Sequence, residues 1–162
     1  MRNFIKLNFI LLLLFVASCG YSPMLKNTDL ENIKISKIDY TGQGDLVYLL
    51  KTNLNIPIQI NSNNSYNLKI NISESLKSLT KNTAGITTEQ ELIINVSFEI
   101  YNNEGKKASA ESLSESRVIS VTNNVSTDDE IKRIEKENII INLSQKLIFA
   151  IKAKIISNQK WL

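Results

Sequence analysis

The segment from Thr127 to Ser157 contains neither Gly nor Pro, and its apolar residues recur at helical spacing. Thr127 and Glu130 form a capping-box pattern at its start. The apolar stripe consists of Ile140, Leu143, Leu147, Ile148, Ile151 and Ile155. We therefore predict a helix of about 25 to 30 residues, about 40 Å long, whose apolar side must cover a broad surface.

Three segments before this helix have the sequence patterns of strands. Residues 66–72 and 92–100 alternate between apolar and polar side chains, which is the pattern of a strand with one buried face. A polar stretch, residues 77–83 with Gly85, separates them. The turn Asn102–Gly105 leads into a last strand, Lys106 to about Val121, whose apolar content is low. Half of that strand is expected to project beyond the core or to pair with something else.

The segment before residue 66 predicts one more strand and a short helix. Alternation around Ile35 changes phase at Ile38, which predicts a strand that contains a bulge or ends early. The glycines of Thr41–Gly44 predict a turn into a helix over Leu46–Leu54. Pro57 restricts the next apolar residues to a sheet edge or to irregular structure.

The order of these segments is strand, helix, strand, strand, strand, helix. It predicts an α+β protein, a two-layer sandwich in which a four-stranded, mostly antiparallel sheet carries two helices on one face. A crossover joins the first two strands, and hairpin connections join the last three. We expect one domain over residues 31–162, long enough to bury roughly two thirds of its unfolded surface.

The first 18 residues have the three parts of a secretory signal. Arg2 and Lys6 supply the positive end, residues 9–17 form a short apolar run, and small residues precede Cys19. The run is shorter than the roughly 20 residues that a membrane-spanning helix needs. We therefore expect residues 1–18 to be removed as a signal peptide.

The sequence Val16–Gly20 places Cys19, the single cysteine of the chain, in a lipobox. An acylated Cys19 would attach the protein to a membrane through its fatty acids, with the polar residues 19–30 as a tether. Gly20 stands where an inner-membrane retention signal has Asp, so we expect the periplasmic side of the outer membrane. The alternative is an ordinary secretory signal that is followed by a cysteine by chance.

Composition argues against several classes of function. The chain has no His, and its one Cys is assigned to the lipid, so the common nucleophile–base pairs and zinc sites cannot be assembled. We expect no enzymatic activity, no metal and no cofactor. Without Arg2 and Lys6, 17 of the 19 basic residues remain against 16 acidic ones, a balance that predicts no binding of nucleic acid. The acidic cluster Asp128–Glu130 could serve a hydrolase, but it is expected to stabilise a helix N-terminus.

In its motifs and in the order of its elements, the chain resembles the lipopolysaccharide-assembly lipoproteins of the LptE family. The resemblance covers nearly the full length. It rests on the start Ala17–Pro23, the short helix Leu46–Leu54, the opening Tyr66–Leu68 of a strand, the paired strands around Asn102–Gly105 and the long C-terminal helix. The resemblance implies a non-catalytic protein that plugs the outer-membrane β-barrel LptD, helps this barrel to fold, and binds lipopolysaccharide during its transport to the outer leaflet.

The interior of a β-barrel is polar, and the expected outward side of the strands is compatible with it. That side consists of Asn67, Lys69, Asn71, Asn95, Ser97 and Glu99. The candidate contacts for the anionic lipopolysaccharide are Lys77, Lys81, Lys106 and Lys107, expected in projecting loops. Lysines that serve only solubility remain the alternative for each. Two other functions remain open, an accessory lipoprotein of another envelope transport or barrel-assembly complex and an envelope hydrolase that uses Asp128–Glu130.

Overall fold

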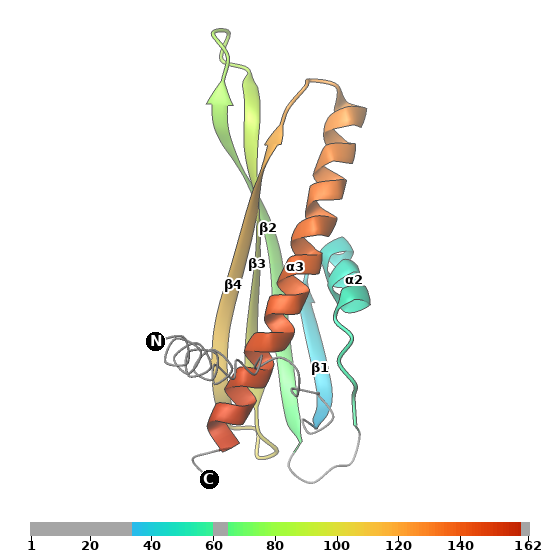
Figure 1. Ribbon diagram of the computed structural model, residues 1–162, viewed down its shortest axis with the longest axis vertical. Coiled ribbons are helices and arrows are strands. Elements are labelled where there is room, and N and C mark those ends of the chain that lie inside the picture. The colour runs from blue at the N-terminus through green and yellow to red at the C-terminus, as the bar shows by residue number, and fades with distance from the viewer. Residues whose placement is uncertain (1–33, 60–64, 160–162) are drawn as a thin grey trace, which may run out of the picture.

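The computed structural model describes residues 34–59 and 65–159. Figure 1 shows its strands and helices in the predicted order. The elements are β1 (Ile35–Gly42), α2 (Gly44–Asn53), β2 (Tyr66–Lys81), β3 (Thr87–Tyr101), β4 (Lys107–Ser120) and α3 (Val125–Gln159). The predicted cleavage of residues 1–18, the acylation of Cys19 and the tether 19–30 lie outside the described residues.

The four strands form one sheet in the order β1-β2-β3-β4. β1 and β2 are parallel, as a crossover through α2 requires, and the other neighbours are antiparallel. Both helices pack on the same face of the sheet, and α3 lies along nearly its whole length (Figure 1). The predicted α+β sandwich with two helices on one face is therefore confirmed.

The core lies between this face and the helices. Successive inward residues of β2 and β3 face each other across the strands, and Leu68 pairs with Ile100, Ile70 with Phe98 and Ile72 with Val96. All of these are buried, as the alternating pattern predicts. The buried residues of α3 that cover them are Ile139, Ile140, Leu143, Ser144, Leu147, Ala150, Ile151 and Ile155. Ile148, predicted on this stripe, is only half-buried at its margin.

β2 and β3 are longer than their apolar patterns indicate. The stretch 77–83, interpreted as a connection, is mostly strand, because β2 continues to Lys81 and pairs with β3 back to Thr87. The two strands meet in a turn in which the Asn82 side-chain oxygen accepts hydrogen bonds from the backbone N–H groups of Ala84 and Ile86, at 3.0 and 2.9 Å. The predicted turn at residues 102–105 is confirmed and has the same construction around Asn102.

β4 pairs with β3 along its length although few of its side chains are apolar. Its helix-facing residue Glu115 accepts hydrogen bonds from Asn142, at 3.0 Å, and from Lys146, at 2.9 Å, both on α3. Glu111, on the same side of β4, pairs with Lys154 at 3.3 Å. These contacts let a polar strand lie beneath a helix, because each carboxylate has a partner of opposite charge.

α3 begins two residues before the predicted cap. The N–H of Thr127 donates to the side-chain oxygen of Asn124 at 3.3 Å, so Asn124 caps the helix and the capping box at Thr127 is wrong. Two smaller predictions hold: β1 is bulged between Ile35 and Lys37, and the segment around Pro57 forms no strand beyond a single bridge at Ile58. None of the helices in the described ranges is long and apolar enough to cross a membrane.

Candidate functional site

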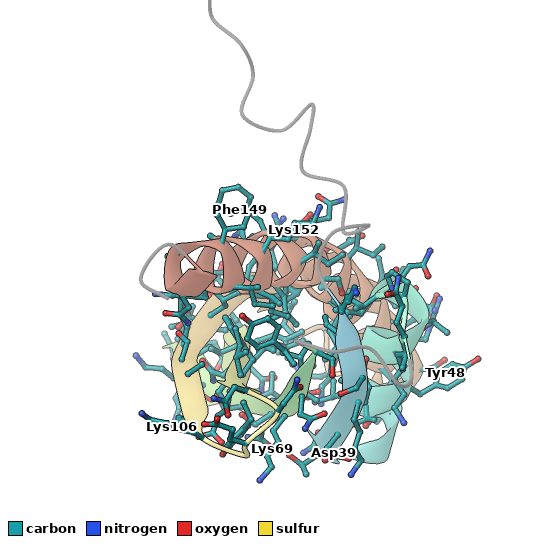
Figure 2. The ribbon with its side chains drawn as sticks, turned by 90° about the horizontal axis from the view of Figure 1, so that it is seen from below. Asp39, Tyr48, Lys69, Lys106, Phe149 and Lys152 are labelled. Atoms are coloured by element: carbon teal, nitrogen blue, oxygen red, sulfur yellow. The ribbon has the colours of Figure 1, made fainter. Side chains whose placement is uncertain are left out.

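The side of the sheet away from both helices, here called the open face, is polar. Figure 2 shows Asp39 and Lys69 of this face, and Lys106 of the turn before β4, on the side opposite α3. Strand pairing aligns its side chains in rows across all four strands. Three consecutive rows are Lys37–Asn67–Tyr101–Lys107, Asp39–Lys69–Glu99–Ala110 and Thr41–Asn71–Ser97–Ser112. The sequence pattern predicted the outward side for Asn67, Lys69, Asn71, Ser97 and Glu99 of these rows, and the structure confirms it.

Charge on the open face is concentrated around Glu99. Its carboxylate accepts hydrogen bonds from the Lys107 ammonium and, at 2.6 Å, from the Tyr101 hydroxyl. The bond from Lys107, and after it the bond from Tyr101, holds the pKa of Glu99 below its ordinary value. The bond to Glu99 in turn raises the pKa of Lys107. The Lys69 ammonium lies 4.8 Å from the centre of the Tyr101 ring, a cation–π contact. The Glu99 carboxylate and the Lys107 ammonium are therefore both ionised at neutral pH and neutralise each other.

A shallow hollow of about 670 Å³ lies over the second and third rows. It is lined by hydroxyl, amide and carboxylate groups from all four strands, among them Asp39, Thr41, Asn71, Ser97 and Ser112. The Thr41 hydroxyl donates to the Asn71 side-chain oxygen at 3.1 Å. Small side chains of this kind present donors and acceptors close to the backbone, so the surface can lie against a polar wall or a hydroxyl-rich ligand.

The four candidate lysines do not come together. Lys77 and Lys81 lie at the far end of β2, and Lys106 and Lys107 lie at the opposite end, in and after the β3–β4 turn. Along the sheet Lys81 lies about 14 residues of strand from Lys107, roughly 46 Å, and Lys77 lies about 10 residues from it, roughly 33 Å. Lys77 and Lys81 are therefore strand residues of a hairpin, which corrects their expected place in a loop.

Beyond Ile72, where the pairing with β1 ends, β2 and β3 continue as a hairpin, here called the arm. β4 accompanies the arm as far as Glu89, and the turn 82–86 projects past β4 (Figure 1). Leu76, Leu79 and Ile86 are exposed large apolar residues on this arm, beside Lys77 and Lys81. The turn segment 102–107, which carries Lys106 and Lys107, contains no exposed large apolar side chain. The arm is thus the better candidate of the two for an anionic amphiphile.

The acidic cluster at the start of α3 makes structural contacts. The Asp128 carboxylate accepts hydrogen bonds from the N–H and hydroxyl of Thr122, each at 2.7 Å, and from the N–H of Asn123 at 3.1 Å. These bonds, the Thr122 N–H first, lower the pKa of Asp128. Glu130 pairs with Arg133 at 2.8 Å. Within residues 34–59 and 65–159, no group of three or more acidic, His or Cys side chains could hold a metal ion.

Several residues of the open face could not be placed from the sequence. Asp39, Thr41 and Ser112 belong to β1 and β4, whose phase the weak apolar patterns leave undefined. Only the alternation of side chains within each strand could assign these residues to the open face. That alternation becomes informative once the register against β2 and β3 is known. Tyr101, one residue beyond the predicted end of β3, would follow from continuing the same alternation.

The fold is shared with bacterial lipoproteins of known structure. The rare lipoprotein B of Shewanella oneidensis superposes with a TM-score of 0.61 at 16% identity, over 76% of this chain and 99% of that chain. A minor lipoprotein of Acinetobacter baumannii gives 0.55 at 21% identity, over 75% and 93%. Lipoprotein B of Nitrosomonas europaea gives 0.55 at 11% identity, over 78% and 90%.

Identities this low establish a common fold and no more. No family model and no curated protein matches the sequence. The chain therefore has a bacterial-lipoprotein fold, and its function has to be argued from its own surfaces.

Proposed function

We propose that this protein is a lipid-anchored, non-catalytic outer-membrane lipoprotein of the LptE kind. In this role it inserts into the lumen of an LptD-like β-barrel, assists the assembly of that barrel, and binds lipopolysaccharide on its way to the outer leaflet. The lipobox at Cys19 supplies the anchor, and the fold shared with other bacterial lipoproteins supports the class. The open face is the observation that carries the proposal.

The open face suits the lumen of a barrel for a physical reason. Among the residues that the structure describes, no helix covers this sheet surface, and most of the side chains in its second and third rows are small and polar. Side chains such as Asn71, Ser97 and Ser112 can exchange hydrogen bonds with water for hydrogen bonds with the polar wall at little cost. Long unpaired charges would resist that transfer, but the charges around Glu99 are already paired with one another.

The β2–β3 arm is the part that we assign to the lipid. Lipopolysaccharide combines phosphate groups with acyl chains, and the arm offers Lys77 and Lys81 next to Leu76, Leu79 and Ile86. A lysine binds phosphate as a point charge, and nearby apolar groups can contact the acyl chains. Lys107 is a weaker candidate because its ammonium is already bonded to Glu99.

Affinity capture of the intact lipoprotein from outer membranes tests the barrel partner. We expect a stoichiometric complex with a large β-barrel. Ser112→Arg, which places a long charge in the centre of the open face, should abolish the complex, whereas Asn138→Arg on exposed α3 should retain it. Circular dichroism should show both variants folded. Capture of a different envelope complex by the wild type would replace this proposal with the accessory-lipoprotein alternative.

Two double variants test the lipid site. Lys77→Ala with Lys81→Ala should weaken binding of purified lipopolysaccharide, and the loss should shrink at high salt because screening already weakens the wild-type contact. Lys106→Ala with Lys107→Ala removes the same charge at the other end of the sheet and should bind nearly as the wild type does. Equal binding by both variants and the wild type would remove the arm from the proposal.

A further inference from the structure

β4 lies at one side of the sheet, and among the described residues no strand pairs with its outer side (Figure 1). The direction of its backbone groups follows from one hydrogen bond, in which the N–H of Val121 donates to the carbonyl of Thr88 on β3 at 2.8 Å. Backbone groups of successive strand residues point to alternate sides, and the pairing with β3 has no shift from Ser109 to Ser120. The groups that point away from the sheet, here called the outer edge, belong to Ala110, Ser112, Ser114, Ser116, Val118 and Ser120.

The outer edge lacks the features that usually prevent strand addition. Edge strands are commonly protected by Pro, Lys, a bulge or a short length, and residues 109–120 contain no Pro, no Lys and no bulge. The opposite edge, β1, is shorter and bulged, and the N–H of Gln59 donates to its Ile35 carbonyl at 2.8 Å. The outer edge of β4 is therefore the side of the sheet that can accept another strand.

The charges of β4 fit a second copy of the same strand. Two copies can pair antiparallel across their outer edges about a two-fold axis normal to the sheet, so that each residue lies opposite the residue equally far beyond the axis. An axis at residue 113 sets Glu111 opposite Glu115, and an axis at 115 sets Glu115 opposite itself. Like charges directly opposite are destabilising. An axis at 114 instead sets Glu111 opposite Arg117 twice, and an axis at 116 sets Glu115 opposite Arg117 twice.

The axis at residue 114 gives the longer contact of these two. It pairs residues 109–119, whereas an axis at 116 pairs only 112–120 of the unshifted stretch. It also leaves Glu115 to its present partners on α3, Asn142 and Lys146. On the open-face side, Val118, which is 59% exposed, would lie opposite Ala110.

We infer that the outer edge of β4 pairs antiparallel with the same edge of a second copy of this chain, with Ser114 at the two-fold axis. Residues 110, 112, 114, 116 and 118 then form five pairs that each exchange two hydrogen bonds, about ten bonds in all. The two sheets become one, with all the helices on one side and both open faces on the other. The contact leaves the open face uncovered, and the inference does not rest on the proposed barrel partner.

Disulfide capture tests the register in the full-length lipoprotein. Ser114→Cys should form a disulfide-linked dimer on mild oxidation, because the Cα atoms of a hydrogen-bonded pair lie about 5.5 Å apart. Ser116→Cys is the matched control on the same face. Its two copies would be four residues apart along the strands, about 13 Å, and should not cross-link. A mixture of Ser112→Cys and Ser116→Cys chains should cross-link, since the axis sets these positions opposite each other. The wild-type chain controls for Cys19.

Sedimentation tests the backbone contact. Ser114→Pro removes an N–H that points away from β3, so the monomer keeps its sheet while the contact between copies loses hydrogen bonds. This variant should weaken the concentration-dependent dimer about tenfold or more. Ser120→Pro also removes an outward N–H, but it lies beyond the paired residues 109–119 and should dimerise as the wild type does. Circular dichroism should show both variants folded.

Three results would each overturn the inference. The first is a Ser114→Cys chain that stays monomeric while its thiol is accessible, which would show that the two edges do not meet at the axis. The second is equal cross-linking of Ser116→Cys alone, which would place the axis elsewhere. The third is a wild-type chain that sediments as a monomer at every concentration, or equal sedimentation of Ser114→Pro and Ser120→Pro.

Discussion

The Oε2 atom of Glu74 on β2 lies 2.7 Å from the Nζ atom of Lys136 on α3. Lys132 approaches the other oxygen of Glu74 at 2.9 Å, and Lys136 also reaches Asp45 of α2 at 3.0 Å. The side chains of Glu74 and Lys136 are only 8 and 14% exposed. This cluster joins the sheet to both helices where the projecting arm begins.

Removal of the Glu74 charge should destabilise the fold. Glu74→Gln leaves the Lys136 ammonium largely buried with a weaker set of partners. We expect a loss of about 3 kcal/mol, the lower end for a buried ion pair, because Lys132 keeps contact with water. Urea unfolding measures it. Glu130→Gln, which breaks an exposed pair with Arg133, should leave the free energy of unfolding nearly unchanged, and an equal loss in both variants would contradict the prediction.

The same carboxylate should give part of the acid sensitivity. Burial raises the pKa of Glu74, but its bonds to Lys136 and Lys132 outweigh burial, so the folded pKa lies below the ordinary value of 4.5. The unfolded chain therefore binds the proton more readily, and the stabilisation is present above pH 4.5 and is lost as the pH falls through the folded pKa. Unfolding of wild type and Glu74→Gln should differ at about pH 6 and converge towards about pH 3. A constant difference would show that Glu74 does not titrate as described.

Gly42 should not accept a side chain. Its φ is +130°, and a Cβ atom there would lie 2.1 Å from the backbone oxygen of Ile72. Gly42→Ala should therefore cost well over about 1 kcal/mol, because both the backbone and β2 must shift. Gly44→Ala is the matched control, since no atom lies within 4 Å of its Cβ position and it opens α2. It should unfold at the same urea concentration as the wild type or a higher one.

The loss of stability in core variants should show that Ile148 lies at the edge of the buried side of α3 and not at its centre. Leu147→Ala, at a fully buried position, should cost about 2 to 5 kcal/mol, and Phe98→Ala opposite the helices about 3 to 5 kcal/mol. Ile148→Ala should cost clearly less than Leu147→Ala, because half of that side chain already contacts water. Thermal or urea unfolding ranks the three variants, and a larger loss at Ile148 would mean that the helix is rotated from the orientation described.

Local patterns gave reliable predictions where one face of an element is apolar. The alternation over Leu92–Ile100 identified the buried side of β3 residue by residue, because every second side chain must leave water. The same signal stops at Ile72 in β2, although that strand continues to Lys81. Backbone hydrogen bonds to β3 hold the far half, whose few apolar side chains do not alternate with polar ones, and periodicity cannot report such pairing. The cap of α3 was misplaced for a related reason, because Asn124 and Thr127 are both suitable caps.

The sequence by itself determined the order of the elements, the inward sides of β2, β3 and most of α3, and the expected lipid site at Cys19, because each depends on residues close together in the chain. Only the tertiary structure decided the rows of the open face, the separation of the two lysine pairs and the partners of Glu74. Those depend on register and on contacts such as that between Asp45 and Lys136, which are 91 residues apart. Many pairings satisfy the same local patterns, and simultaneous packing of all the elements selects one of them.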